Sequence, residues 1–385
     1  MAANALILSG GGARAAYQAG VLLALSELLP CLENPFPIIC GTSAGAINAL
    51  AMAAHPGTFN QSAQDLAQTW RELEVEKVYK TGWGDLTKGL FKVAGSLFHQ
   101  GVARGKPLGL LDNSPLRDLL SGVIPFDNIQ NRVDAGLLEA VCVTALGYSS
   151  GESVSFFQGN PALRGWRRAR RVGTPSLLTV EHLLASSAIP AVFPAVPLNK
   201  EFFGDGAMRQ LAPLSPALHL GASRMFVIGV SHNPMKTRWF KPKRALDHPP
   251  SIAQILGQMF NSAFIDTLEG DLEHLDRTNM LLKLAADKEL CEKTYNLRPV
   301  DTLVITPSKP IDKIAGRRVR DLPKSLRFFM RAVGATARGG GASVASYLLF
   351  SHQYCNELME LGYQDAMWEK AAIEDFFSHP CRLPE

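Results

Sequence analysis

The residues most clearly arranged for chemistry surround Ser43, in the pentapeptide Gly41-Thr42-Ser43-Ala44-Gly45. The apolar residues 38–40 before it are typical of a buried strand, and residues 44–54 after it of a helix. A sharp strand-to-helix turn exposes the serine hydroxyl, and glycines two residues away on either side avoid side-chain clashes. The pattern therefore indicates a nucleophile next to a helix N-terminus, where negative charge is stabilised. A capping serine in an ordinary tight turn is the alternative.

A second candidate is the glycine loop Gly10-Gly11-Gly12, followed by Ala13 and Arg14. It comes after the short apolar stretch 5–9, which reads as a strand. Successive glycines leave backbone N–H groups bare, as an oxyanion hole for acyl transfer requires. The loop nearly matches G-x-G-x-x-G, but a dinucleotide site also needs an acid at the end of the second strand. That strand leads to Ser43 instead, so the oxyanion interpretation is favoured.

A third candidate is Asp205, in Gly204-Asp205-Gly206-Ala207. An aspartate between glycines can approach another loop closely, and its carboxylate can then accept a serine proton and return it to a leaving group. Taken alone, an Asp-Gly pair is more often a simple turn.

Together the three motifs resemble the patatin-like phospholipases, or patatin-like lipid acyl hydrolases. The family pattern is a glycine-rich loop with a basic residue, then G-x-S-x-G, then D-G-[AG]. The matching residues are Gly10, Gly11, Gly12 and Arg14; Gly41, Ser43 and Gly45; and Asp205, Gly206 and Ala207. The resemblance covers about residues 5–220, including the stretch 185–194 before the aspartate. Ala15 and Ser9 depart from the family's usual glycine and aspartate.

The resemblance implies a Ser43–Asp205 dyad that cleaves lipid carboxylic esters through an acyl-enzyme. It implies an oxyanion hole made by the amides of Gly11 and Gly12, helped by Gly10 or Ala13 and by Arg14. The implied fold is a three-layer α/β/α sandwich with a mostly parallel sheet. No metal and no cofactor are implied. The headgroup, acyl chain and bond position stay open among phospholipase A, lysophospholipase, lipase and thioesterase activities.

Two rival functions remain open. An α/β-hydrolase esterase also uses G-x-S-x-G, but it adds an acid and then a histidine later in the chain. Its serine usually follows several strands, whereas Ser43 follows one strand and one helix before its own strand. A non-hydrolytic lipid-binding protein on the same fold is the other rival, disfavoured by the intact Ser43 and Asp205.

The order of elements agrees with the implied fold. The chain opens as strand, loop, helix, strand, loop and helix, which is typical of a parallel sheet covered on both faces. We expect a catalytic domain over 5–230 and a largely helical C-terminal extension over 231–385. That extension contains a long helical pattern at 252–281, a late strand at 302–306 and terminal helices. The glycine- and aromatic-rich stretch 82–109 is a candidate lid.

Composition fits a globular enzyme. The 385 residues are 46% hydrophobic and 19% charged, with a net charge of +4, which permits a sizeable core. No transmembrane helix or signal peptide is recognisable, so we expect a cytoplasmic protein. The six cysteines are scattered without metal-ligand spacing, as buried reduced thiols usually are.

Basic clusters with embedded aromatic residues suggest peripheral contact with an anionic membrane. One contains Trp166, Arg167 and Arg168, and another contains Trp239 and Phe240. A third, at 317–338, places seven basic residues around Phe328. Solvated surface charge is the alternative. Nucleic-acid binding is disfavoured because no recognised module accompanies the clusters.

Overall fold

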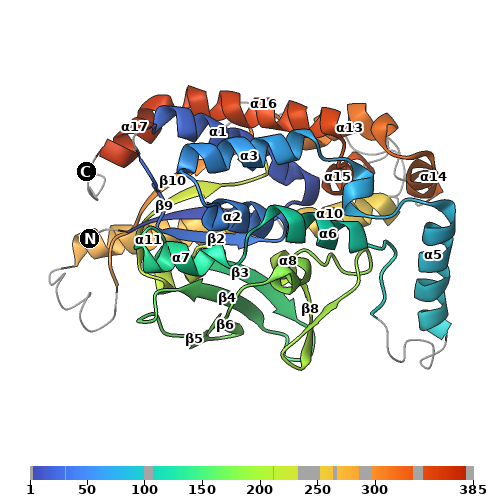
Figure 1. The fold of residues 1–385 in the computed structure, drawn as a ribbon, viewed down its shortest axis with the longest axis horizontal. Helices are drawn as coiled ribbons and strands as arrows, with labels where there is room; N and C mark the ends of the chain where they lie inside the picture. The colour runs from blue at the N-terminus through green and yellow to red at the C-terminus, as the bar shows by residue number, and fades with distance from the viewer. Residues whose placement is uncertain are drawn as a thin grey trace.

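The computed structural model describes residues 3–30, 32–98, 107–210, 212–232, 252–262, 267–285, 297–332 and 341–378. Within these ranges, ten strands form one mixed sheet with helices on both faces (Figure 1). The strands are β1 (Ala3–Leu8), β2 (Ile38–Thr42), β3 (Ala140–Gly147), β4 (Ser153–Gly159), β5 (Trp166–Arg168), β6 (Arg171–Pro175), β7 (Val196–Leu198), β8 (Glu201–Asp205), β9 (Ala222–Ile228) and β10 (Asp301–Ile305). This arrangement confirms the expected three-layer α/β fold with its mostly parallel sheet.

The helices alternate with the strands in the first half of the chain and predominate in the second. Before β9 they are η1 (Gly12–Ala15), α1 (Ala16–Leu28), α2 (Ala44–Ala54), α3 (Phe59–Arg71), α4 (Val75–Val78), α5 (Trp83–Phe98), α6 (Ser114–Val123), α7 (Asn128–Asp134), α8 (Val180–Ser186), η2 (Gly206–Arg209) and α9 (Ser215–His219). After β9 they are α10 (Ile252–Asn261), α11 (Thr267–Leu284), α13 (Ile311–Arg318), η5 (Val319–Asp321), α14 (Lys324–Ala332), α15 (Gly341–Leu348), α16 (His352–Trp368) and α17 (Lys370–Ser378).

The centre of the sheet is parallel and brings the chemical motifs to one edge. Its strand order is β10-β9-β1-β2-β3, followed by the antiparallel β4. Leu8 pairs with Gly41, so the loops that follow β1 and β2 leave the sheet side by side. Strand β8 runs antiparallel to β3 and sets Asp205 opposite Ala145. The glycine loop, Ser43 and Asp205 therefore converge because of strand register.

Alternating side chains divide the interior into two cores, one on each face of the sheet. In β1, Leu6 and Leu8 belong to the larger core, to which α1, α2, α3 and α16 contribute. Ala5 and Ile7 belong to the smaller core, to which α9 and α11 contribute. Both faces of β1 are thus covered, which explains its continuous apolar sequence.

The C-terminal part of the chain is built into this architecture. Strand β10 confirms the expected late strand and pairs in parallel with β9. The expected long helix is present as α10 and α11, on either side of residues 263–266, which lie outside the described residues. Helix α16 lies along α1 (Figure 1). In the glycine-rich stretch 82–109, α5 is described, whereas residues 99–106 are not.

Candidate active site

Ser43 occupies a strained turn between β2 and α2. Its backbone has φ 55° and ψ −130°, a conformation that residues with a side chain rarely adopt. The flanking glycines are required by close approach. A Cβ on Gly41 would lie 2.4 Å from the Gly45 carbonyl oxygen, and one on Gly45 would lie 2.3 Å from the Leu8 carbonyl oxygen. The G-x-S-x-G spacing thus produces a serine held rigidly at the edge of the sheet.

The Ser43 hydroxyl donates a hydrogen bond to Asp205. The distance from Ser43 Oγ to Asp205 Oδ2 is 2.6 Å, and the other carboxyl oxygen accepts from the Ala207 amide at 3.0 Å. Asp205 has no exposed surface, and Ser43 is 1% exposed. Burial raises the pKa of Asp205 to about 7, although the hydrogen bonds from Ser43 and Ala207 partly oppose this shift. The ionised carboxylate is therefore a stronger base than that of an exposed aspartate, and it lies within hydrogen-bond reach of the serine proton.

The hydrogen bonds found for the carboxyl group of Asp205 in the described ranges involve no imidazole. His182 caps its own helix, with Nδ1 3.0 Å from the Thr179 hydroxyl oxygen. The His219 ring stacks on Trp166, and burial lowers the pKa of His219 to about 4, with help from Arg168 and Arg171. Neither histidine has a described hydrogen bond to the Ser43–Asp205 pair.

Ser186 holds the backbone of Ser43 in place through two hydrogen bonds. It is not among the site residues predicted from the sequence. It accepts a hydrogen bond from the Ser43 amide at 2.8 Å and donates one to the Thr144 carbonyl at 2.7 Å. A Cβ on Gly206 would lie 2.1 Å from that same carbonyl oxygen, so Gly206 lets the Asp205 turn pack against β3. The only sequence signal for Ser186 was its place in the stretch that leads to Asp205.

The glycine loop lies beside Ser43, and Gly12 lines the same cavity as the serine. The first backbone hydrogen bond of η1 is donated by the Arg14 amide to the Gly11 carbonyl, at 3.1 Å. The amides of Gly10, Gly11 and Gly12 therefore precede the hydrogen-bond ladder of η1. Gly12 has φ +55°, and a Cβ there would lie 2.2 Å from the Tyr347 carbonyl oxygen, so a larger residue would not fit.

A family model described as patatin-like phospholipase matches residues 6–218. The chain belongs to the patatin-like phospholipase family. A curated cGAMP-activated phospholipase from Pseudomonas aeruginosa (strain BWHPSA011 / Pa011) is 28% identical over 225 residues, which are 56% of each chain. The patatin-like chain thus spans little more than half the length of that relative.

Solved structures with a related fold have lower sequence identity. Human GIVD cytosolic phospholipase A2 has a TM-score of 0.45 at 12% identity, and the match covers 98% of this chain and 60% of that one. VipD from Legionella pneumophila has a TM-score of 0.30 at 13% identity, with coverage of 92% and 67%.

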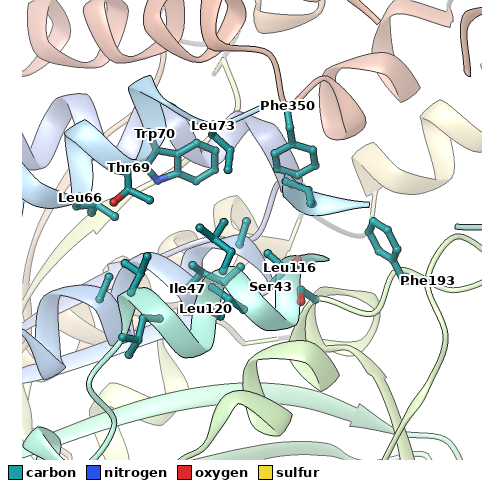
Figure 2. A pocket seen from close by; sticks show the side chains of 18 of the residues that line it. Ser43, Ile47, Leu66, Thr69, Trp70, Leu73, Leu116, Leu120, Phe193 and Phe350 are labelled. Atoms are coloured by element: carbon teal, nitrogen blue, oxygen red, sulfur yellow. The ribbon is translucent and has the colours of Figure 1, made fainter. Parts of the chain in front are cut away.

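An apolar cavity extends from Ser43 in this patatin-like protein (Figure 2). It encloses about 760 Å³ between atoms, its open mouth included. Phe193 and Phe350 lie near the serine, whereas Leu66 and Thr69 lie towards the other end (Figure 2). The remaining lining residues are Gly12, Ala44, Ile47, Ala51, Trp70, Leu73, Val78, Leu116, Leu119, Leu120, Val123, Ile124, Ser187 and Ile189. Its almost entirely apolar lining suits a hydrocarbon chain.

Arg14 of the patatin-like motif directs its side chain into the C-terminal helices. Its guanidinium donates to Ser346 Oγ at 2.8 Å and to Asp312 Oδ1 at 2.6 Å, and it lies 4.0 Å from the centre of the Tyr347 ring. The side chain is 3% exposed. The expected help of Arg14 to an oxyanion is therefore indirect in this geometry, because the charged group is already engaged and instead anchors the loop.

A buried polar chain connects the cavity wall to the glycine loop. The indole Nε1 of Trp70 donates to Asn48 Oδ1 at 2.8 Å, and Asn48 Nδ2 donates to Gln18 Oε1 at 2.9 Å. Gln18 Nε2 in turn donates to the Ser9 carbonyl at 2.8 Å. These three side chains bridge α3, α2 and α1 and fix the start of the loop.

The residues expected at a membrane differ in their surroundings. The Trp166 ring is half-buried and stacked between Phe157 and His219, with centroid distances of 5.3 and 4.8 Å. Arg167 pairs with Glu152 at 2.5 Å, and Arg168 is exposed. Trp239 and Phe240 lie outside the described residues. Among the described helices, none is long and apolar enough to be a candidate membrane span.

Proposed function

We propose that this chain is a serine hydrolase that cleaves carboxylic esters of phospholipids or related lipids through a Ser43–Asp205 dyad. The observation that supports it most directly is the 2.6 Å hydrogen bond between Ser43 and a buried carboxyl group. A base within hydrogen-bond reach is what a weak oxygen nucleophile needs. The apolar cavity that begins at the same serine supports a lipid acyl group as the part of the substrate bound there.

In the proposed reaction, ionised Asp205 accepts the hydroxyl proton while Ser43 Oγ bonds to the ester carbonyl carbon. The tetrahedral intermediate collapses, and protonated Asp205 gives the proton to the departing alcohol. Water then attacks the acyl-enzyme and passes a proton to Asp205. Collapse of the second intermediate releases the fatty acid, and the proton returns to Ser43 Oγ, which regenerates the enzyme.

Backbone amides are the proposed oxyanion donors. The Ser43 amide is engaged by Ser186, so the proposal assigns this role to Gly11 and Gly12, with Gly10 or Ala13 alongside. Preorganised amides stabilise charge that develops in the transition state and need no reorganisation at that moment. The contacts of Gly12 with Tyr347 and of Arg14 with Asp312 support a loop that is rigid before substrate arrives.

Active-site labelling and hydrolysis of a lipid panel test this proposal. A fluorophosphonate probe should label wild type and fail to label Ser43→Ala, and hydrolysis should fall about 1,000-fold or more in Ser43→Ala and in Asp205→Asn. Ser378→Ala and Asp65→Asn are matched controls on the surface and should behave as wild type. Loss of activity on replacing a histidine would favour a Ser-Asp-His triad, and an unlabelled Ser43 would favour a lipid-binding protein.

A further inference from the structure

Four large apolar side chains are exposed together on α5 and α14. Trp83, Leu90 and Phe91 on α5 are 56%, 47% and 77% exposed, and Phe328 on α14 is 64% exposed. The Trp83 and Phe328 rings lie 5.6 Å apart, so the two helices share one surface. Figure 1 shows both helices at one end of the molecule. A cluster of this kind on a globular protein marks an interaction site more often than single exposed apolar residues do.

Both helices are fixed to the body of the protein on their other sides. On α5, Leu86 is buried and Gly89 packs so closely that a Cβ would lie 2.1 Å from the Leu110 carbonyl oxygen. On α14, Leu326 is buried and Ser325 Oγ donates to the Thr81 carbonyl at 2.5 Å. The exposed residues therefore lie on the outer faces of two helices whose inner faces pack against the rest of the protein.

The charges around this apolar cluster are mainly basic. Helix α14 carries Lys324, Arg327 and Arg331 and has no acidic residue, while α5 contributes exposed Lys88 and partly buried Asp85. The neighbouring α13 differs, because its Arg317 and Arg318 both contact Glu357. In the described part of the chain, no ion pair is found for the basic side chains of α14. Positive charge is thus available on the same surface as the aromatic rings.

The cluster is also connected, through backbone contacts, to the lining of the cavity near Ser43. Gly89 of α5 rests on Leu110, whose amide donates to the Ala191 carbonyl at 3.0 Å, and the Leu111 amide donates to the Val192 carbonyl at 2.8 Å. The next residue, Phe193, lines the cavity beside Ser43 (Figure 2). A surface that rested on α5 and α14 would therefore be one segment of chain away from the cavity lining at Phe193.

We propose that the outer faces of α5 and α14, formed by Trp83, Lys88, Leu90, Phe91, Lys324, Phe328 and Arg331, dock on the surface of an anionic lipid bilayer. The inference rests on the proposed function, which requires the substrate to come from lipid. Aromatic rings favour the interfacial region, and basic side chains beside them are attracted to anionic headgroups. A second copy of this chain fits less well, because a two-fold contact would bring like charges together.

Vesicle sedimentation tests the docking surface. Wild type should bind vesicles of phosphatidylcholine with 30% phosphatidylglycerol more strongly than phosphatidylcholine alone, roughly tenfold or more at low salt. Phe91→Ser/Phe328→Ser and Lys88→Glu/Arg331→Glu should each weaken binding to the anionic vesicles by about tenfold or more. Trp368→Ser is the matched control, since Trp368 is 90% exposed on α16 and should be dispensable.

Hydrolysis of a short, water-soluble ester separates docking from catalysis. The surface variants should keep wild-type rates on that ester and lose activity on vesicles in proportion to binding. Wild-type vesicle binding by both double variants, or equal loss in Trp368→Ser, would overturn the proposal. Wild-type dimers that the variants convert to monomers in size-exclusion chromatography would assign the surface to self-association instead. If wild type did not hydrolyse the ester, the proposed dyad would be rejected. The vesicle-binding results would still show whether the surface docks on a bilayer.

Discussion

Asp205 combines two properties that oppose each other in most aspartates. It has no exposed surface, and yet its proposed role as a base requires it to be charged. Burial raises the pKa to about 7, and each of its oxygens accepts one hydrogen bond, from Ser43 or from Ala207. With a pKa close to neutral pH, the carboxyl group can both accept a proton and donate one. This suits a group proposed to act first as a base and then as an acid.

The raised pKa has a consequence for stability that can be measured. An unfolded aspartate ionises near pH 4, so between about pH 4 and pH 7 the folded protein binds more protons at this site than the unfolded chain. The contribution of Asp205 to the free energy of unfolding is present below pH 4 and is lost as the pH rises to 7. We therefore expect Asp205→Asn to be more stable than wild type at pH 8, by at most about 4 kcal/mol.

Urea unfolding at pH 8 and at pH 4.5 measures this difference, which should shrink at the lower pH. Asp276→Asn provides the control, because Asp276 on α11 is exposed and no ion pair or hydrogen bond is found for its side chain among the described residues, so its replacement should leave the pH dependence unchanged. An advantage of Asp205→Asn that is the same at both pH values would contradict a shifted pKa as the cause.

Ser43 shows how a strained residue is retained. Its positive φ is enforced by the glycine contacts on both sides and by Ser186, which ties the Ser43 amide to the Thr144 carbonyl. Strain of this kind persists when surrounding structure over-determines it. The serine motif could be predicted from the sequence. The contact with Ser186 could not, because no local pattern around residue 186 indicates that it lies next to residue 43.

At the scale of elements, the parts that sequence predicted are those set by local pattern. The apolar stretches before Gly10 and Ser43 predicted two strands, and parallel register places their ends side by side. The partners of Arg14 could not be predicted, since Asp312 and Ser346 are about 300 residues away and lie on helices outside the motif region. The stacking of Trp166 on Phe157 and His219 could not be predicted from the basic cluster around it for a related reason, and its expected membrane contact stays a prediction.

Helices α2, α3 and α6 contribute most of the lining of the proposed acyl cavity, and α2 begins at the serine itself. Ala44, Ile47 and Ala51 share one face of α2, at helical spacing from the serine. Ala51 lies seven residues beyond Ala44, which corresponds to about 10 Å along the helix axis. Its small side chain therefore leaves space where a long acyl chain would need it.

Filling that space should shorten the preferred substrate. We expect Ala51→Phe to lower kcat/KM for a palmitoyl ester about tenfold or more relative to a butyryl ester, because the added ring occupies the volume required by the distal carbons. A series of p-nitrophenyl esters from four to sixteen carbons measures the preference, with the butyryl rate as the internal control for folding. An equal loss at every chain length would indicate that the acyl chain lies elsewhere.

For the molecule as a whole, the residues beyond the family match are part of the same packed body. Strand β10 extends the sheet next to β9, and α16 contributes with α1 to the larger core. Glycines on α1 and α16 allow these two helices to pack closely. A Cβ on Gly20 would lie 1.9 Å from the Met359 carbonyl oxygen, and one on Gly362 would lie 2.1 Å from the Tyr17 carbonyl oxygen. The C-terminal helices also hold Arg14, so the position of the glycine loop and the packing of the late helices are linked.

This packing leads us to expect one cooperative unfolding transition that includes α16 and the catalytic part together. Gly362→Val should lower the free energy of unfolding by about 1–3 kcal/mol, because α1 and α16 must separate to admit the side chain. Gly270→Val on α11 is the matched control, since a Cβ there meets nothing within 4 Å. Far-ultraviolet circular dichroism and tryptophan fluorescence should give coincident urea transitions in both variants. Two separate transitions in Gly362→Val, with labelling of Ser43 surviving the first, would show instead that the catalytic part holds together without α16.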